Sequence, residues 1–211
     1  YQPKLVISDI SFLKSLPKKE LICGYAEILK HAIIKDRKFF EWLRKNNIKS
    51  LFNNREKMSY VIRKSCEIKI YFVRKDTNEK NLRMSLNFGH SFAHAIEISN
   101  KFSKNITHGE AVLSGMILEA RLSLIRKICK VETLKKIYEV YRKNNLSYTY
   151  KKFNKARVIK NLIPFLRNDK KNNDDKINFI LLKKIGAVDK PNKNKISLKN
   201  FKNYIETLIQ Y

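Results

Sequence analysis

The chain has 211 residues, which is enough for one domain or at most two small ones. Its 46 lysines and arginines against 19 aspartates and glutamates give a formal net charge of +27 at pH 7. Because 43% of the residues are hydrophobic and only 5 are glycine and 4 proline, the composition excludes wholesale disorder and collagen-like or linker-like chains. The charge suggests an anionic partner, and nucleic acid is the first class to consider.

The three cysteines, Cys23, Cys66 and Cys129, form no CxxC pair, which excludes a disulfide framework and a cysteine-based zinc finger. Their pattern predicts reduced thiols in a cytoplasmic protein. No signal peptide and no apolar run of the ~18 residues that a membrane helix needs is visible, so no membrane partner is expected. Since the first residue is Tyr1 and not methionine, we expect the chain to be a piece of a longer protein.

The hydrophobic pattern predicts a mainly helical chain. The β-branched segment Leu5–Ile10 is expected to be extended, as a strand or a tail, and a helix is expected from Pro17 to about Ile34. Asp36 is placed to cap the next helix. A longer helix is predicted over Arg55–Arg74, because its apolar residues recur mostly at spacings of three and four.

The second half of the chain follows the same helical pattern after a polar turn at Asp76–Asn81. One or two minor strands are expected, the first over Ile177–Leu182. No internal repeat and no low-complexity linker is present. The remaining predicted helices span about Met84–Asn100, Gly109–Ile128, Thr133–Lys143, Asn154–Leu166 and Ser197–Ile209, the last capped by Ser197.

Three of the four histidines lie between positions 90 and 108. On one continuous helix, Arg83, Asn87, His90 and His94 would span an arc of only about 60°. A polar row of histidine and asparagine among apolar flanks indicates a site more than a solvated face. His90 and His94 could share a metal ion. The alternative is one hydrogen-bonded core histidine and one surface histidine.

A third ligand would complete such a metal site. His108 adds weight, since it sits at the entry to another predicted helix, where Gly109 allows a sharp turn. A metal held by two imidazoles takes a harder third ligand, and Glu27 is the candidate. Lys30 lies on the same helix face, so the alternative is an ordinary Glu–Lys pair. From the pattern alone, the pair is favoured.

Several blocks of the chain closely resemble the 3-dehydroquinate synthase family. The most specific are the motifs LNFGHSFAHAIE and HGEAVLSGM. The blocks occur in the family's order and span essentially the whole chain. They are Tyr1–Asp9, Phe12–Pro17, Gly24–Asp36, Arg83–Glu97, His108–Met116, Asp169–Lys171 and Ile177–Gly186.

The resemblance implies a two-domain fold, in which an α/β domain binds NAD and a helical C-terminal domain carries the metal and much of the substrate site. Residues 1–16 would be the connecting segment from a missing N-terminal NAD-binding domain, and residues 17–211 the helical domain. The lack of a Gly-rich nucleotide fingerprint agrees. We therefore expect the isolated chain to be inactive without the NAD domain, whether that domain was truncated or belongs to another chain. The family likeness allows a homodimer.

The resemblance also implies roles for individual residues. Glu27, His90 and His108 would bind Zn²⁺ or Co²⁺. His94 would then be an acid/base group and not a ligand, and Glu79 the other proton acceptor. The substrate contacts would be Lys30, Lys69, Arg83, Asn87 and one of Lys170 and Lys171. The NAD contacts would be Phe12, Leu13, Lys14 and Ser15, while Cys23 departs from the residue that relatives use at a further cofactor contact.

The implied reaction is the conversion of 3-deoxy-D-arabino-heptulosonate 7-phosphate to 3-dehydroquinate in the shikimate route to aromatic amino acids. It is a phosphate-eliminating lyase reaction in which NAD transiently oxidises a ring alcohol. Another sugar-phosphate cyclase or a metal-dependent alcohol dehydrogenase of the same scaffold is the alternative. Lys69, Glu79 and Arg83 together favour the dehydroquinate enzyme, because a dehydrogenase needs no clamp for phosphate and carboxylate.

A basic nucleic-acid-binding helical domain is the third hypothesis, and it rests only on the charge. The basic residues are not interleaved with aromatic residues in a stacking pattern. No helix-turn-helix or RNA-binding signature is found either. The expected anionic partner is therefore a small sugar phosphate.

Overall fold

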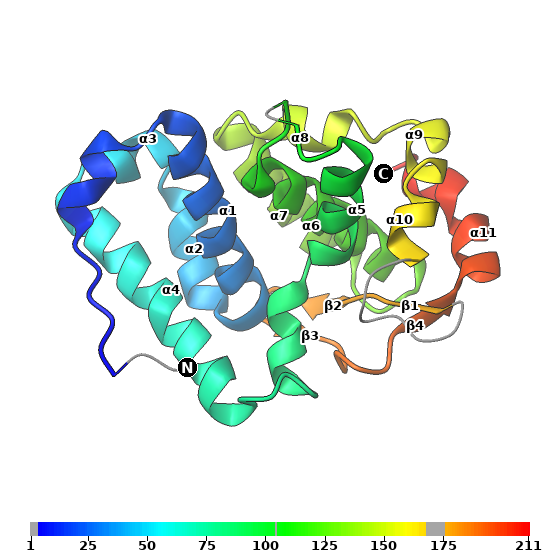
Figure 1. Ribbon diagram of the computed structural model, residues 1–211, viewed down its shortest axis with the longest axis horizontal. Helices are drawn as coiled ribbons and strands as arrows, with labels where there is room; N and C mark the ends of the chain where they lie inside the picture. Colours follow the sequence, from blue (N-terminus) through cyan, green and yellow to red (C-terminus); the bar gives the residue numbers. More distant parts are fainter. Residues whose placement is uncertain (1–3, 104, 168–175) are drawn as a thin grey trace.

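A computed structural model describes residues 4–103, 105–167 and 176–211. Figure 1 shows a mainly helical domain in which the strands are short and lie to one side. The helices are α1 Lys18–Lys35, α2 Arg37–Lys45, α3 Ile48–Phe52, α4 Arg55–Lys75, α5 His90–Ser99, α6 His108–Ile125, α7 Val131–Lys143, α8 Ser147–Lys151, α9 Ala156–Lys160, α10 Ile163–Arg167 and α11 Leu198–Leu208. Two 3₁₀ helices, η1 Ile10–Ser15 and η2 Leu82–Asn87, complete the helical part.

The described residues form four strands: β1 Lys176–Asn178, β2 Leu182–Lys184, β3 Ala187–Val188 and β4 Lys195–Ser197. Strand β1 pairs antiparallel with β4, and β2 pairs antiparallel with β3. Among the described residues, no helix combines the length and the apolarity that crossing a membrane requires. The mainly α fold class predicted from the sequence is confirmed.

The predicted helix caps are confirmed where local side-chain chemistry determines them. The Asp36 carboxylate accepts a hydrogen bond from the Phe39 amide at 2.9 Å at the start of α2. The Ser197 hydroxyl accepts one from the Asn200 amide at 3.2 Å at the start of α11. Both side chains pair a backbone donor that the first turn of a helix leaves free.

The predicted continuous helix over Met84–Asn100 is wrong. Gly89 has φ 84° and ψ −16°, which is left-handed backbone, and it separates η2 from α5. Arg83 and Asn87 therefore belong to η2, whereas His90 and His94 belong to α5. The calculated arc that placed these four side chains on one helix face does not apply.

Two further elements differ from the prediction. The segment 154–166 forms two short helices, because Pro164 lacks an amide hydrogen and is accommodated in the first turn of α10. The predicted strand 177–182 is divided between β1 and β2, and the residues between them, Phe179–Leu181, are buried. Helices α3 and α8 and strands β3 and β4 were not predicted.

Helix α6 forms the centre of the core. Every residue from 109 to 123 except Glu110 is buried, so this helix packs against other elements on all sides. Helices α1, α5, α7, α8 and α11 pack around it, and Figure 1 shows α6 inside this group.

The backbone of α6 comes very close to the turn that begins α5. A Cβ atom built at Gly115 would lie 1.9 Å from the Gly89 carbonyl oxygen, and one built at Gly89 would lie 2.7 Å from Met116 Cγ. Neither position has room for a side chain. The two glycines therefore set how closely α5 and α6 approach each other.

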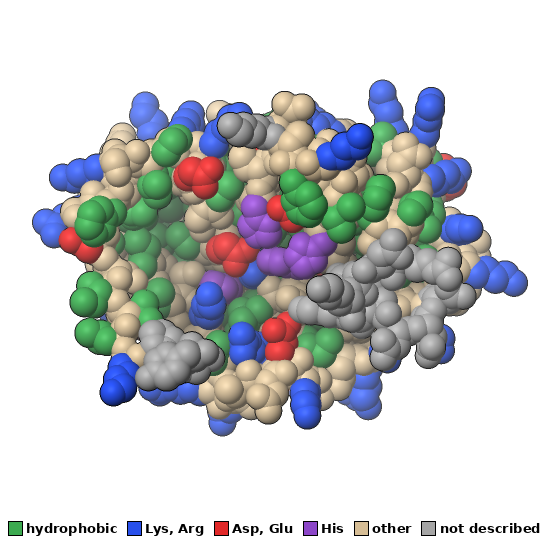
Figure 2. All heavy atoms as spheres, in the orientation of Figure 1, with side chains coloured by type: hydrophobic (Ala, Val, Ile, Leu, Met, Phe, Trp, Pro, Cys, Tyr) green, Lys and Arg blue, Asp and Glu red, His purple; other side chains and the backbone are tan. Residues whose placement is uncertain are grey.

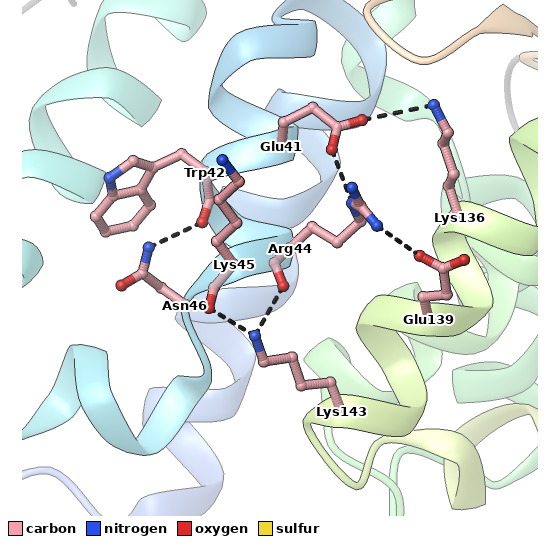
Figure 3. Close-up of polar contacts among 8 residues, drawn as sticks. All are labelled: Glu41, Trp42, Arg44, Lys45, Asn46, Lys136, Glu139 and Lys143. Atoms are coloured by element: carbon pink, nitrogen blue, oxygen red, sulfur yellow. Dashed lines mark hydrogen bonds and ion pairs between the residues drawn. The ribbon is translucent and has the colours of Figure 1, made fainter.

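A group of polar contacts ties α2 to α7 (Figure 3). The Arg44 guanidinium donates to Glu41 at 2.7 Å and to Glu139 of α7 at 2.9 Å. From α7, the Lys143 ammonium donates to the carbonyl oxygens of Arg44 at 2.9 Å and Lys45 at 2.6 Å. These carbonyls end α2 and have no partner within the helix, so Lys143 caps its C-terminus.

Arg121 of α6 is fully buried and collects three polar partners. Its guanidinium donates to the Tyr138 hydroxyl at 2.7 Å, to the Asn154 side chain at 2.8 Å and to the Leu208 carbonyl at 3.0 Å. It also lies 5.5 Å from the centre of the Tyr150 ring, where a cation is attracted to the π-system. Arg121 thereby joins α6 to α7, α8 and α11.

The contact between α5 and α6 gives a first prediction, tested by a matched pair of substitutions. Gly115→Ala should lower the free energy of unfolding by about 1–3 kcal/mol or more, because its methyl group would meet backbone. Gly24→Ala is the control, since a Cβ built at this exposed helical position meets nothing within 4 Å. It should raise the free energy by roughly 0.5–1 kcal/mol. Urea unfolding measures both, and a Gly115→Ala chain as stable as the parent would contradict the assignment.

Candidate metal and substrate site

Three side chains of metal-ligand type converge from three helices. Glu27 comes from the middle of α1, His90 is the first residue of α5, and His108 is the first residue of α6. One ligand atom from each lies within 4.8 Å of the other two. Figure 2 shows the histidines grouped with acidic and basic side chains near the centre of one face. His108 is exposed, so the cluster opens to solvent on its side.

Local structure brings His108 close to α1. Thr107 caps α6 by accepting a hydrogen bond from the Glu110 amide, and the Glu110 carboxylate accepts one from the Thr107 amide in return. The next residue, Gly109, packs against α1 so closely that a Cβ atom would lie 2.3 Å from Cys23 Cα. Cys23 lies one helical turn before Glu27 in α1, so this contact holds the start of α6, and with it His108, beside Glu27.

The orientation of both imidazoles suits a shared metal ion. His90 Nδ1 lies 3.4 Å from the Phe88 carbonyl oxygen, and His90 Nε2 lies 3.7 Å from Glu27 Oε1. His108 Nδ1 lies 3.0 Å from Glu97 Oε1, which leaves its Nε2 for a ligand. Such outer partners orient metal-binding histidines. Ligands of a tetrahedral zinc lie roughly 3.3 Å apart, and the separation of His90 Nε2 from Glu27 Oε1 is 3.7 Å.

The two oxygens of Glu27 have different surroundings. Oε2 accepts a hydrogen bond from the buried Lys30 ammonium at 2.7 Å. Oε1 is buried and has no hydrogen-bond partner among the described residues. A buried oxygen without a partner costs free energy, and this one faces His90. The Glu27–Lys30 pair inferred from the sequence is present, and it leaves one oxygen available for a cation.

Burial controls the protonation of the cluster. It lowers the pKa of His90 to about 3, and the positive charge of Lys30 acts in the same direction. His90 is therefore neutral at pH 7, as a metal ligand must be. Burial also lowers the pKa of Lys30, while the Glu27 carboxylate opposes this effect.

A second group of predicted residues meets at η2 and the turn before it. The Asn87 side-chain amide donates to Glu79 Oε1 at 2.7 Å, and Arg83 Nε lies 4.0 Å from Glu79 Oε2. The Arg83 guanidinium also donates to the Thr77 carbonyl at 2.6 Å. Glu79 has φ 55°, a left-handed conformation that non-glycine residues adopt mainly where the surroundings enforce it.

Asp76 holds this turn in place. Its carboxylate accepts hydrogen bonds from the amides of Lys80 at 3.0 Å, Asn81 at 2.7 Å and Arg83 at 3.0 Å. Three backbone donors on one carboxylate determine the path of the chain between Glu79 and Arg83. The sequence indicated a polar turn here, but not this role for Asp76.

The remaining predicted residues lie in different places. The ring of His94 is 5.7 Å from that of His90, edge to face. Lys69 is exposed on α4 and acts electrostatically on the buried Lys30 and His31. Lys170 and Lys171 lie outside the described residues.

The segment expected to contact NAD forms η1 and lies apart from the Glu–His–His cluster. Of its members, Phe12 is largely exposed, whereas Leu13 and Lys14 line a cavity of about 360 Å³ between η1 and the start of α4. Arg55 and Met58 of α4 also line this cavity.

Two carboxylates near the cluster were not found by sequence reasoning. Glu97 follows His90 by seven residues, two helical turns, and this spacing could have indicated that it shares a helix face with the histidine. Glu119 accepts a hydrogen bond from the Gly89 amide at 2.8 Å. It lies 30 residues away in the chain, and no local signal indicates that contact.

The fold is shared with part of two larger solved synthases. The chain superposes on 2-epi-5-epi-valiolone synthase (ValA) from Streptomyces hygroscopicus with NAD⁺ and Zn²⁺ bound, with TM-score 0.74 and 23% identity over 96% of this chain and 54% of that one. It superposes on 2-deoxy-scyllo-inosose synthase complexed with carbaglucose-6-phosphate, NAD⁺ and Co²⁺, with TM-score 0.76 and 22% identity over 98% and 56%.

Residues 24–172 match the family model described as 3-dehydroquinate synthase C-terminal, and the chain belongs to this family. The 3-dehydroquinate synthase of Pelagibacter ubique is 44% identical over 187 residues, which cover 89% of this chain and 51% of that protein. The enzyme of the same name from Thermoanaerobacter pseudethanolicus is 36% identical over 189 residues, or 90% and 52%. The chain spans about half the length of these curated relatives.

A buried histidine next to the cluster gives a second prediction, on pH and stability. His31 Nδ1 and Ser65 Oγ share a hydrogen bond of 2.6 Å between α1 and α4, and burial lowers the pKa of His31 to about 3 from 6.5. Between pH 6.5 and 3 the unfolded chain binds a proton that the folded chain does not. Stability should therefore fall with falling pH, by about 1.4 kcal/mol per pH unit for each such proton.

The double variant His31→Leu, Ser65→Ala removes both partners of this hydrogen bond. The dependence of stability on pH should then become shallower by the contribution of up to about one proton, about 1.4 kcal/mol per pH unit. Urea unfolding at pH 4, 5 and 6 measures the slope. Equal slopes in the variant and the parent chain would show that His31 is protonated in the folded state.

Proposed function

We propose that the chain is the metal- and substrate-binding part of a 3-dehydroquinate synthase. The whole enzyme would convert 3-deoxy-D-arabino-heptulosonate 7-phosphate to 3-dehydroquinate and phosphate with NAD and a divalent metal. The convergence of Glu27, His90 and His108 carries the proposal. Relatives that bear this enzyme's name support it, and so do cyclases of the same fold that hold NAD⁺ with Zn²⁺ or Co²⁺.

The residues fit Zn²⁺ or Co²⁺. One carboxylate and two neutral imidazoles leave a coordination position open for substrate, which is typical of catalytic metal sites. Glu27 Oε1 is buried and has no hydrogen-bond partner in the part of the chain that the structure describes, and a cation would satisfy it. When bound, the metal would act as a Lewis acid on a substrate oxygen.

The basic residues of the site would bind the anionic substrate. Arg83 and Lys69 would hold phosphate and carboxylate through charge-assisted hydrogen bonds. The ammonium of Lys30 has three donors, and only one is used by Glu27, so it can also reach a substrate oxygen. His94 and Glu79 would move protons. We place Lys170 or Lys171 in the same clamp.

Most of the NAD site would be formed by residues of a separate domain that is not among these 211 residues. In this proposal residues 1–16 connect to an N-terminal NAD-binding domain, and the NAD contacts of this chain are Phe12, Leu13, Lys14 and Ser15 of η1. The cavity beside η1 would then lie next to the cofactor. All three cysteines are free thiols, which suits the cytoplasmic location that we infer.

Metal binding gives a third prediction. Glu27→Gln removes the charge of one proposed ligand and should weaken Zn²⁺ binding tenfold or more. The matched control is Glu20→Gln, at an exposed glutamate in the first turn of the same helix, which should bind as the parent does. Competition with a chromophoric chelator gives both affinities. Unchanged binding by Glu27→Gln would mean that Glu27 serves only as the partner of Lys30.

Turnover gives a fourth prediction. The chain alone should release no phosphate from 3-deoxy-D-arabino-heptulosonate 7-phosphate with NAD and Zn²⁺. The chain joined to the N-terminal half of the Pelagibacter ubique enzyme should release it and form 3-dehydroquinate. Assays with a hexose 6-phosphate and a heptulose 7-phosphate test the alternative, and turnover of these substrates alone would assign the chain to another sugar-phosphate cyclase.

A further inference from the structure

Helix α5 begins without a side-chain cap. Gly89 is its N-cap and has no side chain to accept a hydrogen bond from the first turn. The amide groups at a helix start need acceptors when they are buried, and both Gly89 and its surroundings are buried. The acceptor must therefore come from another element.

Glu119 of α6 supplies it. This side chain is fully buried, and its Oε2 accepts the Gly89 amide at 2.8 Å. Hydrogen-bonding groups of Ser91 and Ile180 also face the carboxyl group. Burial raises the pKa of Glu119 well above its ordinary value, and these donors oppose that effect. Oε1 of Glu119 is buried and has no hydrogen-bond partner among the described residues. The Gly89 amide on Oε2 is therefore the hydrogen bond through which this buried carboxyl group fixes the backbone at the start of α5.

The contact acts directly beside a proposed metal ligand. His90 directly follows Gly89, so the position of the Gly89 backbone determines the position of the His90 Cα atom, from which the imidazole projects. Gly115, one helical turn before Glu119, packs against the carbonyl oxygen of the same Gly89. One face of α6 thus holds Gly89 by its amide and by its carbonyl. The same helix begins with His108, so α6 carries one ligand and locates another.

We propose that Glu119 is a positioning residue that sets the place of His90 in the metal site by accepting the hydrogen bond of the Gly89 amide. The inference rests on the proposed function, since it takes His90 to be a metal ligand. The proposal predicts that metal affinity depends on the length of the side chain at position 119, which lets it meet the Gly89 amide, and not on its charge. Mutation of residues that orient metal ligands without touching the metal typically lowers metal affinity 10- to 100-fold.

Two variants separate the effect of side-chain length at position 119 from the effect of its charge. Glu119→Gln keeps the length and a carbonyl oxygen that can accept from Gly89, and it should bind Zn²⁺ within about threefold of the parent. Glu119→Asp keeps the carboxylate but is one methylene shorter, and it should bind tenfold or more weakly. Ser123→Ala is the control one turn along α6. It removes a hydroxyl that donates to the Glu119 main-chain carbonyl and accepts from the Leu182 amide, but it leaves the Glu119 carboxyl group in place, so it should lower stability and not Zn²⁺ affinity. Co²⁺ absorption spectra should change for Glu119→Asp alone.

Equal Zn²⁺ affinities of Glu119→Asp and the parent, or equal losses in Glu119→Asp and Glu119→Gln, would overturn the inference. Hydrogen exchange of the metal-free chain gives a second, independent readout. The Gly89 amide should be protected in the parent and in Glu119→Gln and exchange faster in Glu119→Asp, and equal protection would also overturn it. A parent chain that binds no Zn²⁺ would refute the proposed function, while the exchange data would still decide whether Glu119 holds Gly89.

Discussion

The close approach of α6 to two neighbouring backbones is the constraint on which the rest of the structure depends. Gly109 meets Cys23 of α1, and Gly115 meets Gly89 at the start of α5. At both places a single methyl group would collide with main-chain atoms, which cannot move aside as a flexible side chain can. Glu27, His90 and His108 are therefore brought together by packing of the core, because well-packed interiors admit few alternative arrangements.

The interior of the site is nearly balanced in charge although the chain carries +27. Glu27 pairs with Lys30, and His90 is neutral because it is buried. On the face that Figure 2 shows, many lysine and arginine side chains project from the rim of the molecule. The excess charge is thus a surface property. It can raise the rate at which small anions arrive, while the few basic side chains of the site determine how an anion is held.

Local signals explain most of what the sequence predicted. Helices α1, α2, α4, α6, α7 and α11 follow from apolar spacing and from caps such as Asp36 and Ser197, which depend on residues two to four positions apart. The break at Gly89 was missed because its cause is not local. The left-handed backbone there is held by Gly115 and Glu119, and periodicity continues across residues 84–100 as if no break existed.

In the candidate site, too, the residues within motifs were predicted from the sequence, whereas those that act through contacts between distant segments were not. The motifs identified Glu27, His90 and His108 together with Glu79, Arg83 and Asn87, and the structure places each trio in one cluster. Residues that orient them, such as Glu119, contribute through contacts between distant segments. A backbone amide and a buried carboxylate 30 residues apart leave no pattern that one sequence can display.

Buried Arg121 has a consequence for how the domain is completed. Its planar guanidinium needs partners in fixed directions, and one of them is the Leu208 carbonyl of α11. During synthesis α11 leaves the ribosome after every other helix described here. Until α11 docks, a cation inside the core lacks one of its acceptors, and such a vacancy is costly. The polar contacts of Arg121 are therefore complete only once α11 has packed against α6.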